Sequence, residues 1–269
     1  MSATNIMIVG GGHMGSAIAF GLQRSSADMS ITVVETDPTR RASIASAGIS
    51  TQEELPNPLS DDVIILAIPP QAFLRFSESK SNAHIEQYTG VIISAMAGVR
   101  IWELTARLKS AQVYRTIPNL PCGINEGMTI LVAAPRITLA SIIVVNELLS
   151  KLGNLLAVKD EALLDSATAL VGGGPAYIAY FAEAFTEYAV ASGFDRSSAA
   201  SITLQILRGS TATLEQCKEP AMNLCEKVMT PGGTTARAID YFNIQGAQDT
   251  IIEGLKKACA RSIELGRSR

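Results

Sequence analysis

The chain has 269 residues and a net charge of −3, with 47% hydrophobic and 17% charged residues. This length and composition predict one large or two modest domains with a buried core, and they exclude an intrinsically disordered chain. No basic block or stripe occurs, so nucleic acid and anionic membrane surfaces are poor candidates for partners.

The sequence has no uninterrupted apolar run of the roughly 18 residues that a membrane-spanning helix needs. Residues 1–5 lack a basic region and lead directly into a strand pattern, so we expect no signal peptide. Four cysteines lie without CxxC spacing and the histidines are only His13 and His84, which argues against a metal site. We therefore expect a cytoplasmic protein with reduced thiols and no metal.

Short apolar, mostly β-branched runs alternate with helical patterns over the first part of the chain. Strands are expected at residues 5–9, 31–34, 62–68, 91–94, 112–117 and 128–133, and helices at 16–22, 40–47 and 141–152. Continuous rather than alternating apolar strands are typical of a parallel sheet that is covered on both faces. The order predicts an α/β fold with an N-terminal Rossmann-type doubly wound, mostly parallel sheet.

After about residue 160 the β-rich runs end, and Ala, Leu, Glu and Gln recur at helical spacing. We therefore predict a dinucleotide-binding Rossmann domain over residues 1–158 and an all-helical dimerisation and substrate-binding domain over 159–269. The expected helix Ala176–Phe185 is apolar around most of its circumference, so it must be buried on all sides. A domain of about 110 residues can hardly bury several such helices alone, which indicates a homodimer formed through the helical domain.

The stretch Gly10–Gly15 fits the pattern G-x-G-x-x-G between the first strand and the first helix. Gly12 would let a pyrophosphate approach the backbone, and Gly15 would let the helix pack on the strand. The pattern alone is weak, but the acidic Glu35 follows 20 residues after Gly15 at the end of the second strand. The predicted cofactor-binding residues here are Gly10, Gly12, His13, Met14, Gly15 and Glu35.

The preferred dinucleotide stays open between NADH and NADPH, with NADH slightly favoured. Glu35 can accept hydrogen bonds from the adenosine ribose and would repel a 2′-phosphate, whereas Arg40 and Arg41 could contact that phosphate. The ends of later strands should lie along the same crevice. The further cofactor-binding residues expected there are Ala67, Ile68, Pro69, Ala97, Gly98, Pro118 and Asn119, of which Asn119 alone has a polar side chain.

A second Gly-rich turn, Thr230–Thr235, leads into an expected helix at residues 236–242. Such a turn leaves backbone N–H groups at the positive end of the helix dipole, which suits a carboxylate. A plain turn with a threonine N-cap is the alternative interpretation. The predicted substrate-binding residues are Thr230, Gly232, Gly233, Thr234 and Thr235.

These motifs together resemble the pyrroline-5-carboxylate reductase family over nearly the whole chain. Gly172–Tyr177 is similar to the family's G-S-G-P-A-Y, Thr230–Thr235 to its S-P-G-G-T-T, and Ile117–Pro121 to its M-P-N-T-P. The resemblance implies a Rossmann domain followed by a helical dimerisation domain, in dimers that often assemble into larger rings. It also implies reduction of the C=N bond of 1-pyrroline-5-carboxylate to L-proline by NADPH or NADH, the last step of proline biosynthesis.

The sequence departs from the family's pattern at Pro69, Leu120 and Gly173, where the family has lysine, threonine and serine. These departures concern the cofactor and the exact imine rather than the fold. Two alternatives therefore stay open, a non-catalytic or divergent NAD(P)-binding paralogue and a reductase for a related cyclic imine carboxylate. A β-hydroxyacid dehydrogenase is disfavoured, because no lysine lies between Lys159 and Lys218.

In the reaction that the resemblance implies, hydride goes from the nicotinamide to the imine carbon, which is already electrophilic when the nitrogen is protonated. Positioning then matters more than a strong acid. Our hypothesis is that the N–H groups of Gly233 and Thr234 and the Thr230 hydroxyl hold the substrate carboxylate. The Thr235 hydroxyl would bond the ring nitrogen, which makes Thr235 the predicted catalytic residue.

Overall fold

The structure, a computed structural model, describes residues 4–25, 28–57, 59–60, 62–79, 85–86, 88–110 and 112–267. His84 and residues 1–3 of the N-terminal segment, both considered above, lie outside these residues. By its contacts the chain divides into two units, Met1–Pro175 with Lys256–Arg269, and Ala176–Leu255. The predicted domain boundary at residues 158 and 159 stays a prediction.

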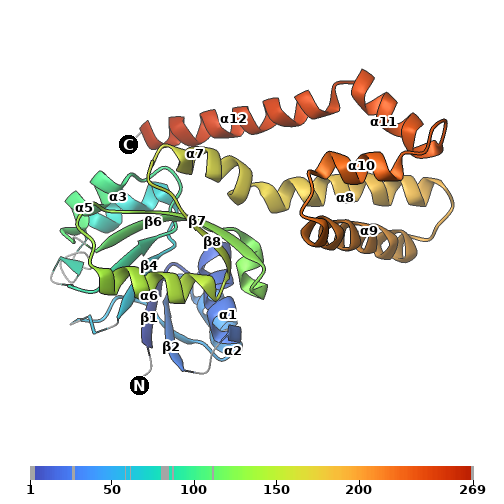
Figure 1. Ribbon diagram of the computed structural model, residues 1–269. Coiled ribbons are helices and arrows are strands. Elements are labelled where there is room, and N and C mark those ends of the chain that lie inside the picture. Colours follow the sequence, from blue (N-terminus) through green and yellow to red (C-terminus); the bar gives the residue numbers. More distant parts are fainter. Residues whose placement is uncertain are drawn as a thin grey trace. The chain divides into compact units, whose positions relative to one another are not determined.

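Within the described residues, the strands form one eight-stranded sheet in the order β3-β2-β1-β4-β5-β6-β7-β8 (Figure 1). The strands are β1 (Thr4–Val9), β2 (Met29–Val34), β3 (Ser50–Gln52), β4 (Val63–Leu66), β5 (Val91–Ser94), β6 (Val113–Ile117), β7 (Gly127–Ala133) and β8 (Gly153–Ala157). All neighbouring pairs are parallel except β6 and β7. The strand order reverses between β1 and β4, which confirms the predicted doubly wound, mostly parallel sheet.

The central strands are buried at every position, which explains their uninterrupted apolar sequences. All four residues of β4 and all four of β5 are buried, and Ile64 lies opposite Ile92 in the register. Because successive side chains point to opposite faces, Ile64 and Leu66 enter one core cluster while Val63 and Ile65 enter another. A strand that is covered on both faces in this way can be apolar throughout.

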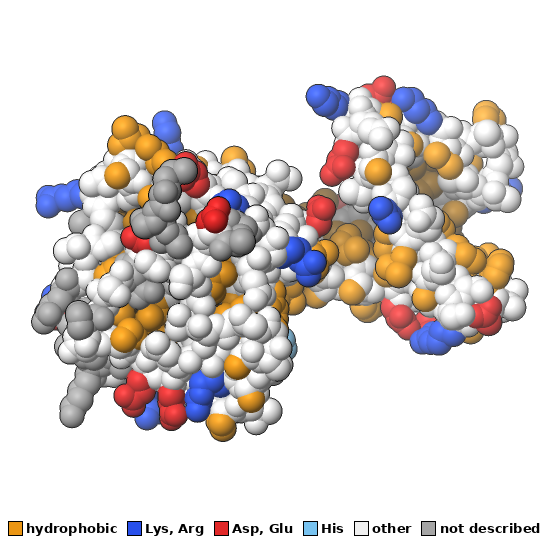
Figure 2. Space-filling model, turned by 90° about the horizontal axis from the view of Figure 1, so that it is seen from below, with side chains coloured by type: hydrophobic (Ala, Val, Ile, Leu, Met, Phe, Trp, Pro, Cys, Tyr) orange, Lys and Arg blue, Asp and Glu red, His pale blue; other side chains and the backbone are white. Residues whose placement is uncertain are grey.

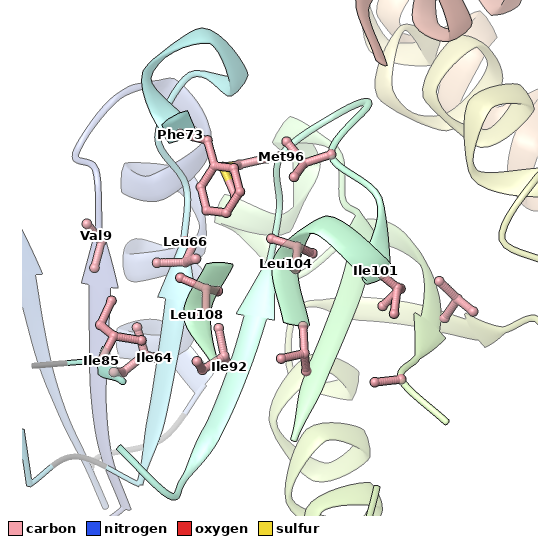
Figure 3. Close-up of a cluster of buried hydrophobic side chains, with 14 of the residues drawn as sticks. Val9, Ile64, Leu66, Phe73, Ile85, Ile92, Met96, Ile101, Leu104 and Leu108 are labelled. Atoms are coloured by element: carbon pink, nitrogen blue, oxygen red, sulfur yellow. The ribbon is translucent and has the colours of Figure 1, made fainter. Parts of the chain in front are cut away.

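Helices of the first unit supply the rest of both clusters. Beside Ile65 they are α1 (His13–Ser25), α2 (Pro38–Ser46) and α6 (Leu139–Ser150), through Ile18, Ile44 and Leu148. Beside Ile64 they are α3 (Phe73–Ser77), α5 (Ile101–Leu108) and α7 (Leu163–Ala167), through Phe73, Leu104 and Leu164. Figure 3 shows Phe73 and Met96 above Leu66, with Leu108 next to Ile92. The short turns η1 (Pro70–Ala72), η2 (Leu120–Ile124) and η3 (Thr168–Gly172) complete this unit.

Helices account for the second unit, as the sequence predicted. They are α8 (Gly174–Ala191), α9 (Arg196–Cys217), α10 (Ala221–Val228), α11 (Thr234–Ile244) and α12 (Ala247–Arg267), of which α8 begins and α12 ends in the first unit. Among the described residues, no helix combines the length and the apolar character that crossing a membrane requires.

Large apolar side chains of the second unit are exposed in the single chain (Figure 2). On α8 these are Ile178, Tyr180, Phe181, Phe185 and Tyr188, and on α11 Tyr241, Phe242 and Ile244. Tyr180 and Tyr188 each keep 76% of their surface exposed, and α11 contains no buried residue. Exposed apolar surface on this scale is typical of a protein–protein interface.

Candidate functional site

The glycine loop connects β1 to α1, and its three motif glycines stand in different surroundings. Gly10 has a φ of +104°, and a Cβ there would lie 2.7 Å from the Ala67 carbonyl oxygen. A Cβ at Gly15 would overlap the Gly10 carbonyl oxygen. A Cβ at Gly12 would meet no described heavy atom within 4 Å. Packing therefore requires Gly10 and Gly15, whereas Gly12 leaves open space in which a pyrophosphate could reach the backbone.

The first turn of α1 begins at His13, three residues earlier than the sequence indicated. His13 is exposed and Met14 is partly buried against the core, while the Ser16 N–H donates to the Gly12 carbonyl at 2.9 Å. The helix thus starts immediately after Gly12, with the positive end of its dipole at the loop. This arrangement fits a dinucleotide pyrophosphate.

Glu35 lies at the end of β2 with only 6% of its surface exposed. Its carboxylate accepts the backbone N–H groups of Gly11 and Asp37, both at 2.8 Å, and Arg40 Nη2 at 3.2 Å. Burial by itself would raise the pKa of Glu35, but these hydrogen bonds outweigh it and lower the pKa below the usual glutamate value. Glu35 is therefore anionic at neutral pH, and it also holds the glycine loop in place.

Both arginines that could bind a 2′-phosphate, Arg40 and Arg41, already have hydrogen-bond partners. Arg40 pairs with Glu35, although 56% of its side chain is exposed. Arg41 Nη1 donates to the Glu35 carbonyl at 2.7 Å, and its Nη2 lies 3.0 Å from Glu53 Oε2. Both arginines are thus held close to Glu35, so a 2′-phosphate that bound them would lie near the negative charge of Glu35.

The loops after β4, β5 and β6 leave the same edge of the sheet as the glycine loop. Ala67, Ile68 and Pro69 follow β4, Ala97 and Gly98 follow β5, and Pro118 and Asn119 follow β6. Adjacent loops are joined, because the Ala67 N–H donates to Val9 and the Ala95 N–H donates to Leu66. Asn119 Oδ1 accepts the Met128 N–H at 2.8 Å, which fixes the direction of its amide NH₂ group. A Cβ at Gly172 would lie 3.8 Å from Ile117, so the glycine-rich stretch 172–174 begins beside the end of β6.

In the second unit, Thr230–Thr235 forms a tight turn followed by α11. The Gly233 N–H donates to the Thr230 carbonyl at 2.9 Å, and Gly232 has a φ of +71°. Pro231 before a glycine with positive φ is the pattern of a type II turn. A Cβ at position 233 would overlap the Thr230 hydroxyl and lie 3.0 Å from the Thr230 carbonyl oxygen, so a larger residue would require the Thr230 side chain to move.

The helix α11 begins at Thr234 rather than at residue 236, with Gly233 as an N-cap that offers no side-chain hydrogen bond. The threonine N-cap alternative is therefore wrong, and Thr234 and Thr235 stand in the first turn. One part of our hypothesis also needs correction, because the Gly233 N–H already bonds Thr230 and cannot serve a carboxylate in this conformation. The first-turn N–H groups of Thr234 and Thr235 have no intrahelical acceptor and are the better donors.

Sequence reasoning missed Gly11, the second residue of the loop. A Cβ there would lie 2.7 Å from Ile44 Cδ1, and the N–H of Gly11 is a hydrogen-bond donor to Glu35. The three consecutive glycines were the available signal, but the G-x-G-x-x-G pattern allows any residue at this position.

Known protein families match both the N-terminal sheet region and the C-terminal helical region. Residues 161–265 match the family described as pyrroline-5-carboxylate reductase dimerisation, and residues 5–98 match NADP oxidoreductase coenzyme F420-dependent. The pyrroline-5-carboxylate reductase of Pseudomonas aeruginosa is 32% identical over 271 residues, which cover 98% of each chain. The chain belongs to the pyrroline-5-carboxylate reductase family.

Solved structures of such reductases have the same fold along their whole length. The enzyme of Coxiella burnetii superposes with a TM-score of 0.84 at 26% identity, over 98% of each chain. The pyrroline carboxylate reductase of Plasmodium falciparum, solved with NADP bound, superposes with a TM-score of 0.83 at 22% identity, over 99% of each chain. Both similarities span the sheet and the helices, so the family match is not confined to the common Rossmann part.

Proposed function

We propose that this protein reduces 1-pyrroline-5-carboxylate to L-proline with a reduced nicotinamide dinucleotide. The observation that carries the proposal is the start of α11, which lacks a side-chain cap and has two threonine hydroxyls in its first turn, in a member of this family. A helix start of this kind suits a small carboxylate. Gly12, with open space before it, and the anionic Glu35 fit the dinucleotide.

Each part of the turn has a separate role in the proposed reaction. The N–H groups of Thr234 and Thr235, with the Thr230 hydroxyl, hold the substrate carboxylate. The Thr235 hydroxyl bonds the ring nitrogen and orients the C=N bond. A bound reduced nicotinamide supplies the hydride. The imine carbon gains that hydride and the nitrogen carries one proton, so a C–H and an N–H bond replace the π bond.

A direct assay tests the function. The protein is mixed with 1-pyrroline-5-carboxylate and either NADH or NADPH, and absorbance of the reduced nicotinamide is followed while L-proline is measured. Stoichiometric loss of absorbance and formation of proline are expected. Binding of dinucleotide without oxidation would favour a non-catalytic paralogue, and turnover only with another ring size would favour a related cyclic imine.

For the cofactor, we propose a preference for NADH. The buried, anionic carboxylate of Glu35 would repel a 2′-phosphate, and Arg40 and Arg41 are already engaged. Replacing Glu35→Gln removes the charge but keeps a hydrogen-bond acceptor for the loop. We expect the ratio of kcat/KM for NADPH over NADH to rise about tenfold, equivalent to roughly 1.4 kcal/mol of lost repulsion.

The matched control for this prediction is Glu54→Gln, which removes an exposed carboxylate on the segment that follows β3. Its cofactor ratio should stay within about twofold of wild type, because exposed charges are well screened. An unchanged ratio in Glu35→Gln, or an equal change in both variants, would contradict the role of Glu35.

For assembly, we propose a homodimer through the helical region, with larger rings of dimers as a further level. The exposed apolar residues of α8 and α11 and the match to a dimerisation family support this proposal.

Light scattering should give a mass of about 57 kDa, twice the 28.4 kDa chain, or a multiple of it. Introducing a charge by Tyr188→Glu should shift the mass towards the monomer, whereas Glu183→Gln, an exposed polar change on the same helix, should not. A wild-type monomer at micromolar concentration would contradict the proposal.

A further inference from the structure

An arginine is completely buried in the first unit, behind the edge where the cofactor loops emerge. Arg115, in β6, has 0% of its surface exposed. Its Nη1 donates to Glu161 Oε1 at 2.8 Å, and its Nη2 lies 3.6 Å from Asp165 Oδ1. A buried charge is costly unless it is paired, so the two carboxylates are held close to Arg115.

The same two carboxylates also bind the end of the loop that follows β5. Asp165 Oδ2 accepts Arg100 Nη2 at 2.7 Å, and Glu161 Oε1 accepts the Ile101 N–H at 2.8 Å. Arg100 and Ile101 come directly after the segment 95–99, which contains the predicted cofactor-binding residues Ala97 and Gly98. The buried pairs therefore fix the point at which this loop returns into α5.

The C-terminal turn of α12 contacts the same structure at two points. Ser262 Oγ donates to Asp165 Oδ1 at 3.1 Å, and both residues are buried. A Cβ at Gly266 would lie 2.9 Å from the Gly98 carbonyl oxygen. Gly98 is buried with a φ of +72°, a conformation that residues other than glycine rarely adopt. The loop is thus supported at its end by Asp165 and near its middle by α12.

We propose that Asp165 is a positioning residue which, with Ser262 and Gly266 of α12, holds the loop Ala95–Arg100 in the shape that receives the nicotinamide ring. This inference rests on the proposed function and on the prediction that Ala97 and Gly98 bind the cofactor. The strands are already joined by their own ladder and by the apolar core. Apart from its ion pair with Arg115 of β6, Asp165 acts on the loop, through Arg100. A small displacement of a reacting group lowers turnover steeply.

The principal test is Arg100→Met, which keeps the length of the side chain and leaves Asp165 with Arg115 and Ser262. We expect kcat to fall about tenfold and the primary isotope effect with 4-deuterated NADH to rise, because hydride transfer becomes slower. The dissociation constant of NADH should change by less than about threefold, since Gly12 and Glu35 hold the other half of the dinucleotide. Emission of bound NADH should weaken as its ring loses a fixed environment.

Two milder variants keep the test decisive if Arg100→Met folds poorly. Ser262→Ala removes one hydrogen bond to Asp165, and Gly266→Ala places a methyl group against the Gly98 carbonyl. Both should lower kcat and NADH emission, as Arg100→Met does. Arg100→Lys should retain part of the kcat and emission that Arg100→Met loses. The control is Tyr114→Phe, which removes a buried 2.8 Å hydrogen bond to Ser141. Tyr114 precedes Arg115 in β6, but its side chain points to the opposite face of the sheet, so both readouts should stay unchanged.

Unchanged kcat and NADH emission in Arg100→Met, Ser262→Ala and Gly266→Ala would overturn the inference, as would an equal loss in Tyr114→Phe. Failure of the proposed function looks different. Wild-type protein would then bind NADH without reducing 1-pyrroline-5-carboxylate, and the emission of bound NADH would still decide whether these residues position the loop.

Discussion

Replacing Thr235→Val should lower kcat for imine reduction on the order of 100-fold. Valine has nearly the shape of threonine, so the first turn of α11 should be preserved while the hydroxyl proposed to bond the ring nitrogen is lost. The N–H groups of Thr234 and residue 235 remain, so KM for the substrate should rise by less than about fivefold. Initial rates at saturating NADH, with proline measured directly, give both constants.

The matched variant Thr235→Ser keeps a hydroxyl at the same place and should retain at least about a third of wild-type kcat. The NADH dissociation constant should be the same in all three proteins, because Thr235 has no proposed contact with the dinucleotide. If valine and wild type turn over equally fast, the hydroxyl has no part in the reaction. A loss shared equally by serine and valine would point to packing of α11 instead.

The sheet and the cofactor loop could be predicted because their signals are local. The β-branched runs around Ile64 and Ile92 are uninterrupted, and in the structure both strands are buried on both faces. The glycine spacing at residues 10–15 and the acid at position 35 reflect steric needs of a single turn and one strand end. Local chemistry of this kind is fully contained in a short window of sequence.

Other features depend on contacts that no short window contains. Arg100 bonds Asp165 across 65 positions, and Ser262 bonds it across 97. In sequence, Arg115 occupies a strand position that would normally be apolar. No neighbouring residue in the sequence indicates which carboxylates it pairs with. The short edge strand β3 (Ser50–Gln52) contains no apolar residue, so its sequence has no strand pattern.

For Thr230–Thr235 the sequence predicts the type of local structure correctly but does not determine its hydrogen bonds. Proline and two glycines predicted a turn before a helix, and both are present. Whether the N–H of Gly233 closes the turn or stays available depends on the φ of Gly232, which sequence does not give. The proposed carboxylate donors are therefore the N–H groups of Thr234 and Thr235 rather than that of Gly233.

Replacing Gly12→Val should weaken NADH binding on the order of 100-fold, equivalent to roughly 2.7 kcal/mol, and leave the folded protein intact. A Cβ at position 12 would meet no described heavy atom within 4 Å, so we expect the apoprotein to accept the side chain. Its methyl groups would fill the space through which a pyrophosphate reaches the backbone at the start of α1. Titration of NADH by fluorescence measures the affinity, and the thermal midpoint without ligand should change by less than about 2 °C.

The informative contrast is Gly15→Ala in the same loop, where the added Cβ would overlap the Gly10 carbonyl oxygen. Backbone would have to move, so this variant should lose both stability and binding, with a thermal midpoint several degrees below wild type. Gly12→Val should lose NADH affinity without losing stability, because its side chain obstructs only the bound dinucleotide. If valine at position 12 bound NADH as tightly as wild type, the dinucleotide could not approach the chain at this glycine. If it unfolded the apoprotein, Gly12 would be needed for packing rather than for the cofactor.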